Sequence, residues 1–189
     1  MSKLIYFYLN RPNSVTVNLF KCTSTGVLVK FFGTYGILYY LFFKKIYLEY
    51  FQDITKFYII VCTKKKRLKK FLGLIFTLFA SALLDVSLSY RFFLRLRGVG
   101  FKVFRKKTLL ILEVGFSHLV QIKIPGNIYV KIKNRKNTRF LIQGFNRHFI
   151  KEFADYIKNL RYPNEYTLKG VHYRNEVLIK KIGKQLQQK

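Results

Sequence analysis

The sequence has little negative charge and few of the side chains that build active sites or metal sites. Only 8 of its 189 residues are Asp or Glu, and these are scattered along the chain. The three histidines, His118, His148 and His172, have no spacing typical of metal ligands. The two cysteines, Cys22 and Cys62, form no CxxC pair, so nothing indicates a zinc site or a disulfide framework. We therefore expect no metal, no cofactor and no catalytic residues, and the sequence predicts that the protein is not an enzyme.

Nucleotide-binding motifs and membrane-spanning runs are also missing. Gly98-Val99-Gly100 lacks the third glycine and the helix of a dinucleotide fingerprint, and no phosphate-binding loop occurs, so we expect no small-molecule substrate. The uncharged run from Phe71 to Leu84 has 14 residues, whereas a membrane-spanning helix needs about 20. This run predicts a buried helix and no membrane insertion. The open alternative is a small membrane-associated basic protein, anchored by residues 71–84 behind the basic residues 64–70.

Alanine and tryptophan are scarce, whereas residues with AT-rich codons are abundant. Alanine occurs at only three positions and Trp is absent, but the chain has 20 Phe and 14 Tyr. This bias indicates an AT-rich genome, and we expect an organellar one, with the mitochondrial matrix as the location of the protein. A plastid, a cytoplasmic location and an AT-rich nuclear genome are the open alternatives. Residues 1–10 resemble neither a signal peptide nor a transit peptide, as expected for a protein made inside an organelle.

A large excess of positive charge is the main feature that the sequence does have. The chain contains 36 Lys and Arg, which gives a formal net charge of +28. Half of the residues are apolar, so the chain can build a core. Self-repulsion on this scale destabilises a compact fold unless a polyanion neutralises it. Nucleic acid is the first candidate partner, followed by an anionic membrane and an acidic protein.

Hydrophobic periodicity predicts two blocks of strands, each followed by a helix. The expected strands lie within residues 14–43, 46–51, 57–62, 92–97, 101–104, 108–114, 121–124, 129–133 and 138–142. Whether residues 44–70 form strands or a loop stays open. Gly33 and Gly36 predict a hairpin turn between two of the early strands. Several later strands combine an apolar face with a Lys/Arg face. Asn146 is expected to cap a helix whose apolar stripe runs from Phe149 to Leu160.

This order of elements predicts an α+β protein of two tandem small domains, each with an antiparallel-rich sheet packed against a helix. We place an N-terminal domain, with hairpins and a linking helix, at residues 1–88. The C-terminal domain is expected at residues 89–189 and includes a basic C-terminal tail. Residues 161–184 of this tail combine six cations and three tyrosines with only two carboxylates. Interleaved cations and aromatic rings are typical of a loop that binds a polyanion with flat bases.

Short motifs in the second half occur in the order and at the spacing of a known family. They are Arg97-Gly98-Val99-Gly100-Phe101, Gly115-Phe116-Ser117-His118, Pro163-Asn164-Glu165-Tyr166, Lys169-Gly170-Val171-His172-Tyr173 and Lys181-Ile182-Gly183-Lys184. On these motifs the chain resembles the large-subunit ribosomal protein L6 family (uL6) of bacterial and organellar type. One departure is Tyr166-Thr167-Leu168-Lys169-Gly170, where the family has Tyr-Lys-Gly-Lys-Gly.

The resemblance implies a structural constituent of the large ribosomal subunit that binds folded large-subunit rRNA near the factor-binding region and supports translation. Neighbouring large-subunit proteins would be its other partners. Cations would neutralise phosphates, glycines would let the backbone approach RNA, and aromatic rings would stack or donate. For the tyrosines, packing against the domain's own sheet is the alternative. The expected rRNA-binding residues are Arg97, Lys102, Tyr166, Lys169, Gly170, His172, Tyr173, Arg174, Lys180, Lys181, Gly183 and Lys184.

Overall fold

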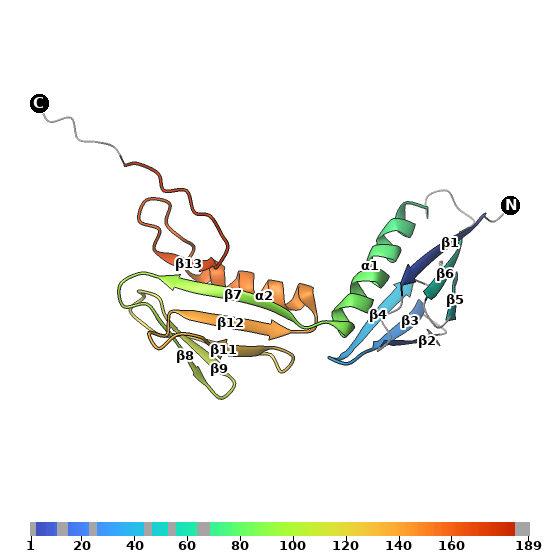
Figure 1. Cartoon of the computed structure of the whole chain (residues 1–189), viewed down its shortest axis with the longest axis horizontal. Coiled ribbons are helices and arrows are strands. Elements are labelled where there is room, and N and C mark those ends of the chain that lie inside the picture. The colour runs from blue at the N-terminus through green and yellow to red at the C-terminus, as the bar shows by residue number, and fades with distance from the viewer. Residues whose placement is uncertain are drawn as a thin grey trace, which may run out of the picture. The chain divides into compact units, whose positions relative to one another are not determined.

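The computed structural model describes residues 3–10, 15–22, 26–43, 47–52, 56–63 and 69–183. The chain divides into two compact units, Met1–Ser89 and Tyr90–Lys189. The fold is α+β, and the sheets pair their strands in antiparallel fashion, as the sequence predicted (Figure 1).

The described residues of the first unit form two three-stranded sheets and one helix (Figure 1). One sheet has the order β1–β6–β5, formed by Lys3–Asn10, Lys56–Thr63 and Tyr47–Gln52. The other has the order β2–β3–β4, formed by Thr16–Cys22, Gly26–Phe32 and Ile37–Phe43. From the sequence it was open whether residues 44–70 form strands or a loop. Strands β5 and β6 show that much of this range forms strands. Strand β1 was not predicted.

Helix α1 (Lys69–Ser87) packs against strands β3 and β4. The rings of Phe79 and Phe31 meet edge to face, with their centroids 5.2 Å apart. The hairpin turn between β3 and β4 is confirmed by a hydrogen bond of 3.1 Å from the Gly33 N–H to the Gly36 carbonyl. Gly33 lies so close to the helix that a Cβ there would be 2.5 Å from the Val86 carbonyl oxygen. Residues 71–84 lie within α1, and no helix in the described part of the chain is long and apolar enough to cross a membrane.

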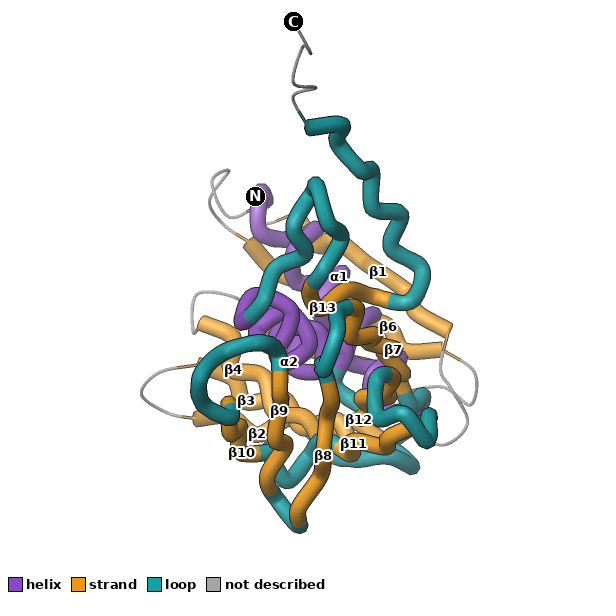
Figure 2. The backbone as a smooth tube through the Cα atoms, turned by 90° about the vertical axis from the view of Figure 1, so that its left-hand side faces the viewer, coloured by secondary structure: helices purple, strands orange, loops and turns teal. Residues whose placement is uncertain are grey.

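The second unit contains a four-stranded sheet, a three-stranded sheet and helix α2 (Arg147–Leu160). The larger sheet has the order β11–β12–β7–β13, formed by Tyr129–Ile132, Arg139–Gly144, Tyr90–Arg97 and Gly170–Tyr173. The smaller sheet has the order β10–β9–β8, formed by Val120–Lys123, Leu109–Glu113 and Lys102–Lys106. Figure 2 shows β8 and β9 as a projecting hairpin.

Helix α2 covers one face of the larger sheet, where it packs against β7, β12 and β13. Its predicted apolar stripe buries Ile150, Phe153, Ala154 and Ile157 in a core shared with both sheets. The predicted cap is also confirmed, because the Asn146 side chain accepts a hydrogen bond of 3.1 Å from the N–H of Phe149. The cap satisfies one of the backbone donors that the first turn of a helix leaves open.

Part of residues 161–184, which the sequence assigned to a basic C-terminal tail, forms strand β13. Gly170–Tyr173 pair with the end of β7, in a register that places Gly170 opposite Arg97 and Tyr173 opposite Leu94. Val171 is fully buried in the core of the second unit. The four-residue strand gives little periodic signal of its own, and it is a strand because the edge of β7 is available to pair with it.

Candidate nucleic-acid interface

The face of the larger sheet that α2 leaves uncovered carries a row of cations. In β7, Leu94 and Leu96 are buried on the helix side, and successive side chains of a strand point to opposite faces. Arg95 and Arg97 are therefore directed to the open face, where both are exposed. Arg139 of β12 lies opposite Arg95 and joins it on that face. Strand pairing thus brings together cations that lie far apart in the sequence.

Two adjoining hollows on this face have cationic linings. One, of about 700 Å³, is lined by Arg95, Lys133, Arg139 and Arg174 with apolar residues and Asn134. The second, of about 480 Å³, shares Arg95 and Arg139 and adds Arg97 and Lys136. Among the residues that the structure describes, no carboxylate lines either hollow. We call the set of six cations the basic sheet face: Arg95, Arg97, Lys133, Lys136, Arg139 and Arg174.

Local structure holds several of these cations in place. The Arg174 guanidinium lies 5.6 Å from the centre of the Phe93 ring, and the Arg174 N–H donates to the Phe93 carbonyl over 2.9 Å. Lys136 lies in the turn between β11 and β12, where its N–H donates to the Asn134 side chain over 3.4 Å. Guanidinium groups match phosphate with two parallel hydrogen bonds, so a face rich in arginine is suited to a polyphosphate backbone.

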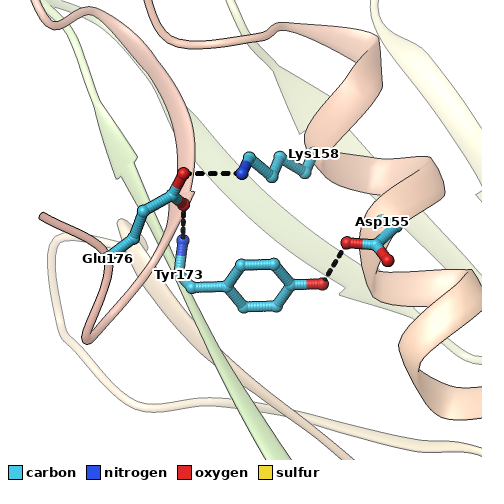
Figure 3. Close-up of polar contacts among 4 residues, drawn as sticks. All are labelled: Asp155, Lys158, Tyr173 and Glu176. Carbon is cyan, nitrogen blue, oxygen red and sulfur yellow. Dashed lines mark hydrogen bonds and ion pairs between the residues drawn. The ribbon is translucent and has the colours of Figure 1, made fainter. Parts of the chain in front are cut away.

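Four residues fasten the chain that follows β13 to helix α2 (Figure 3). The Lys158 ammonium lies 2.6 Å from Glu176 Oε1, and the Tyr173 N–H donates to Glu176 Oε2 over 3.1 Å. The Tyr173 hydroxyl donates to Asp155 Oδ1 over 2.6 Å. We call this set, Asp155, Lys158, Tyr173 and Glu176, the α2–tail network. It fixes the backbone next to Arg174 and so supports the basic sheet face.

The environment of the network sets the protonation of two of its members. Burial, with the hydrogen bond to Asp155, raises the pKa of Tyr173 well above its ordinary value of 10.0, so the hydroxyl stays a donor. Burial also tends to raise the pKa of Glu176. The hydrogen bonds from Lys158 and from the Tyr173 N–H outweigh that effect and hold the pKa of Glu176 below 4.5.

Three of the expected contact residues are partly or largely covered by the protein's own residues. His172 is only 5% exposed, and burial, with the charge of Arg95, lowers the pKa of its imidazole below 6.5. Gly170 is buried against Pro163. Because glycine has no Cβ, the backbone of Pro163, and not RNA, can approach closely at this position. Tyr173 is half-buried, with its ring 6.2 Å from that of Phe92. We therefore leave these three out of the proposed interface. For Tyr173, the ring contact with Phe92 of β7 favours the alternative of packing on its own sheet.

The other expected residues within the described part of the chain are exposed but do not form one site. Arg97 and Arg174 belong to the basic sheet face. Tyr166 and Lys169 line a separate hollow of about 560 Å³ in the loop 160–169, and Lys181 forms an ion pair with Glu165 of that loop. The remaining three are Lys102 at the start of β8 and Lys180 and Gly183 in the tail. Lys184 lies outside the described residues.

Four cations of the basic sheet face were not singled out from the sequence: Arg95, Lys133, Lys136 and Arg139. The alternation of apolar and basic residues in 92–97 was the available signal, because it places Arg95 and Arg97 on one face. In the described ranges, no group of three or more His, Cys, Asp or Glu side chains could hold a metal ion.

The fold and the basic sheet face define a small, strongly basic α+β protein with a surface suited to a polyanion. The family model for ribosomal protein L6 matches residues 97–174. The chain is 33% identical over 121 residues to large ribosomal subunit protein uL6 of Mycoplasmopsis synoviae (strain 53), an alignment that covers 64% of this chain and 66% of the relative. It is 35% identical over 119 residues to protein uL6c of Porphyra purpurea, covering 63% of this chain and 65% of the relative.

A third alignment extends over almost the whole chain. Large ribosomal subunit protein uL6 of Protochlamydia amoebophila (strain UWE25) is 30% identical over 176 residues, which is 93% of both sequences. The chain belongs to the ribosomal protein L6 family. The first two alignments cover about two thirds of the relatives' length.

Proposed function

We propose that the protein is a structural constituent of the large ribosomal subunit and binds folded large-subunit rRNA through the basic sheet face. The observation that carries the proposal is the set of six cations on one sheet face, in hollows where the described part of the chain places no carboxylate. Folded RNA is recognised mainly by its shape and its phosphates, which such a surface can match without reading a sequence. The relatives that the chain matches are named as proteins of the large ribosomal subunit, which supports the same role.

Family membership also supports the expectation that the protein is not an enzyme, because this is a family of structural ribosomal proteins. Neighbouring large-subunit proteins are its expected further partners. We propose a position near the factor-binding region and a place in the mitochondrial ribosome. The composition biased towards Phe and Tyr supports an organellar gene. The relatives include bacterial proteins and one protein of plastid type, uL6c of Porphyra purpurea. The location is tested by sedimenting lysates of isolated mitochondria and of plastids on sucrose gradients at high salt. The gradients show in which organelle the protein sediments with the large subunit.

The rRNA-binding proposal is tested by the salt dependence of affinity for large-subunit rRNA. Six cation–phosphate contacts predict that log K falls with log salt with a slope of about −4 to −5. The double variant R95Q/R139Q should make this slope less negative by roughly 1.5, because two contacts are lost. The control K123Q/K151Q removes two exposed cations on β10 and α2 and should leave the slope close to that of the unmodified protein. Equal slopes for the two double variants would contradict the assignment of the basic sheet face.

A further inference from the structure

We propose that Phe116, His118, Arg161 and Tyr162 form a stacking site for unpaired bases of RNA. This inference rests on the proposed function, since it adds base recognition to a surface that contacts phosphates. We call these four residues the aromatic end cluster. All four are exposed, and Phe116 and Tyr162 expose 40% and 60% of their surface.

The flat groups of Phe116, His118 and Arg161 lie next to one another. The rings of Phe116 and His118 are almost parallel, with an interplanar angle of 15° and centroids 6.0 Å apart. The Arg161 guanidinium carbon lies 5.2 Å from the centre of the Phe116 ring. Tyr162 follows Arg161 directly, and the Lys158 ammonium lies 5.3 Å from its ring centre. Proteins stack splayed-out RNA bases on aromatic rings and on guanidinium planes.

The cluster is held by packing and does not depend on the ligand for its shape. Gly115 has φ +77°, and an added Cβ would lie 3.1 Å from the ring of buried Phe101, so the turn presses against the core and leaves Phe116 outside. Arg161 follows the last residue of α2, and its carbonyl accepts a hydrogen bond of 2.9 Å from the N–H of Val171. A pre-organised site loses little side-chain and backbone entropy when it binds.

The cluster lies near the same end of β7 as Arg97 of the basic sheet face. Gly170 of β13 lies opposite Arg97, the last residue of β7, and next to it Val171 bonds to Arg161. The hollow of the loop 160–169 begins at the same place, because Arg161 and Tyr162 line it together with Lys169. RNA whose phosphates follow the basic sheet face would therefore reach the aromatic end cluster where β7 ends.

The mixture of flat rings and cations favours a nucleotide over a protein as the occupant. An apolar protein surface would bury the Arg161 guanidinium next to the Phe116 ring without supplying a counter-charge, which is unfavourable. A nucleotide supplies both a base for the rings and a phosphate for the cations. Glu165 also lines the hollow, but it is paired with Lys181.

Binding of the full chain to a short single-stranded oligoadenylate and to an abasic oligomer of equal length tests the inference, because both probes carry the same phosphates. The unmodified protein should bind the oligoadenylate more tightly, by roughly 5- to 150-fold, if one base stacks. F116L keeps an apolar side chain and R161K keeps the charge, so each removes only a flat group. Both variants should lose most of the preference for bases and bind the abasic oligomer as the unmodified protein does.

The basic sheet face supplies the matched comparison. R139Q should weaken binding of both probes by the same factor, because it removes a phosphate contact and no stacking group. If F116L and R161K retain the preference for bases, the stacking site is wrong while the proposed function stands. The stacking site is also wrong if the two variants retain the preference for bases but sediment less with the large subunit. That result would indicate that the cluster contacts a neighbouring protein. If the unmodified protein binds neither probe nor large-subunit rRNA at low salt, the proposed function itself fails.

Discussion

Gly170 stands at a position where no other residue fits without strain. Its φ is +149°, and an added Cβ would lie 2.6 Å from Pro163 Cα and 2.9 Å from the Arg161 carbonyl oxygen. We expect G170A to reduce the free energy of unfolding by about 2–3 kcal/mol, because it combines backbone strain with overlap of packed atoms. Chemical denaturation followed by tyrosine near-UV circular dichroism measures the loss. G126A, where nothing lies within 4 Å of the added Cβ, is the control and should change stability by less than about 1 kcal/mol.

Glu176 makes the stability of the α2–tail network depend on pH. Its pKa is held below 4.5 in the folded protein, so its ionised form stabilises the fold fully above the unfolded pKa. That contribution is lost as pH falls from about 4.5 through the lower folded pKa. We expect E176Q to destabilise the protein by about 1–2 kcal/mol at pH 7, because a charge-assisted hydrogen bond from Lys158 is lost.

The pH dependence separates this effect from a general packing defect. Denaturation at pH 7, 5 and 3 should show the difference between the unmodified protein and E176Q becoming smaller as the pH falls below 4.5, because Glu176 becomes protonated. The exposed E152Q on α2 is the control and should behave as the unmodified protein at pH 7. A difference between E176Q and the unmodified protein that stays constant from pH 7 to pH 3 would speak against an ionised Glu176 in the network.

At the scale of elements, the N-terminus of α2 depends on one side chain. Asn146 satisfies the N–H of Phe149 in the first turn. N146A should therefore cost about 1 kcal/mol of stability, and N146D should retain most of it because aspartate caps as well. Thermal unfolding of the three proteins gives the comparison. N159A, at an exposed position within α2, is expected to be neutral or slightly stabilising, since alanine is the better helix former.

The elements that the sequence predicted are those whose pattern is local. The stripe of α2, its Asn146 cap and the turn at Gly33 each depend on residues within a few positions of one another. Strand β13 could not be predicted in the same way, because its place is decided by the distant edge of β7. The burial of His172 and Gly170 follows from that pairing. Two residues of a segment with the composition of an RNA-binding tail are therefore buried.

At the scale of the whole molecule, the net charge does not determine where the cations of the basic sheet face come together. The net charge of +28 predicts a polyanionic partner, but it does not say where the charge is concentrated. Pairing of β7 with β12 places Arg95 opposite Arg139, and the turn before β12 adds Lys136. Alternation in β7 was visible in the sequence, whereas the register between strands was not. The site is thus a product of sheet pairing more than of any motif.

The same charge predicts opposite effects of salt on folding and on binding. Raising the ionic strength from about 0.1 to about 1 M shortens the screening length from roughly 10 to 3 Å, which weakens repulsion among the cations of the free protein. We expect the denaturation midpoint of the free protein to rise over this range, while affinity for rRNA falls. The variant K106Q/K123Q removes two exposed charges away from the basic sheet face. It should raise the midpoint at low salt and flatten its salt dependence, without changing the salt slope of rRNA binding. A midpoint that falls with salt in the unmodified protein would show that self-repulsion does not limit its stability.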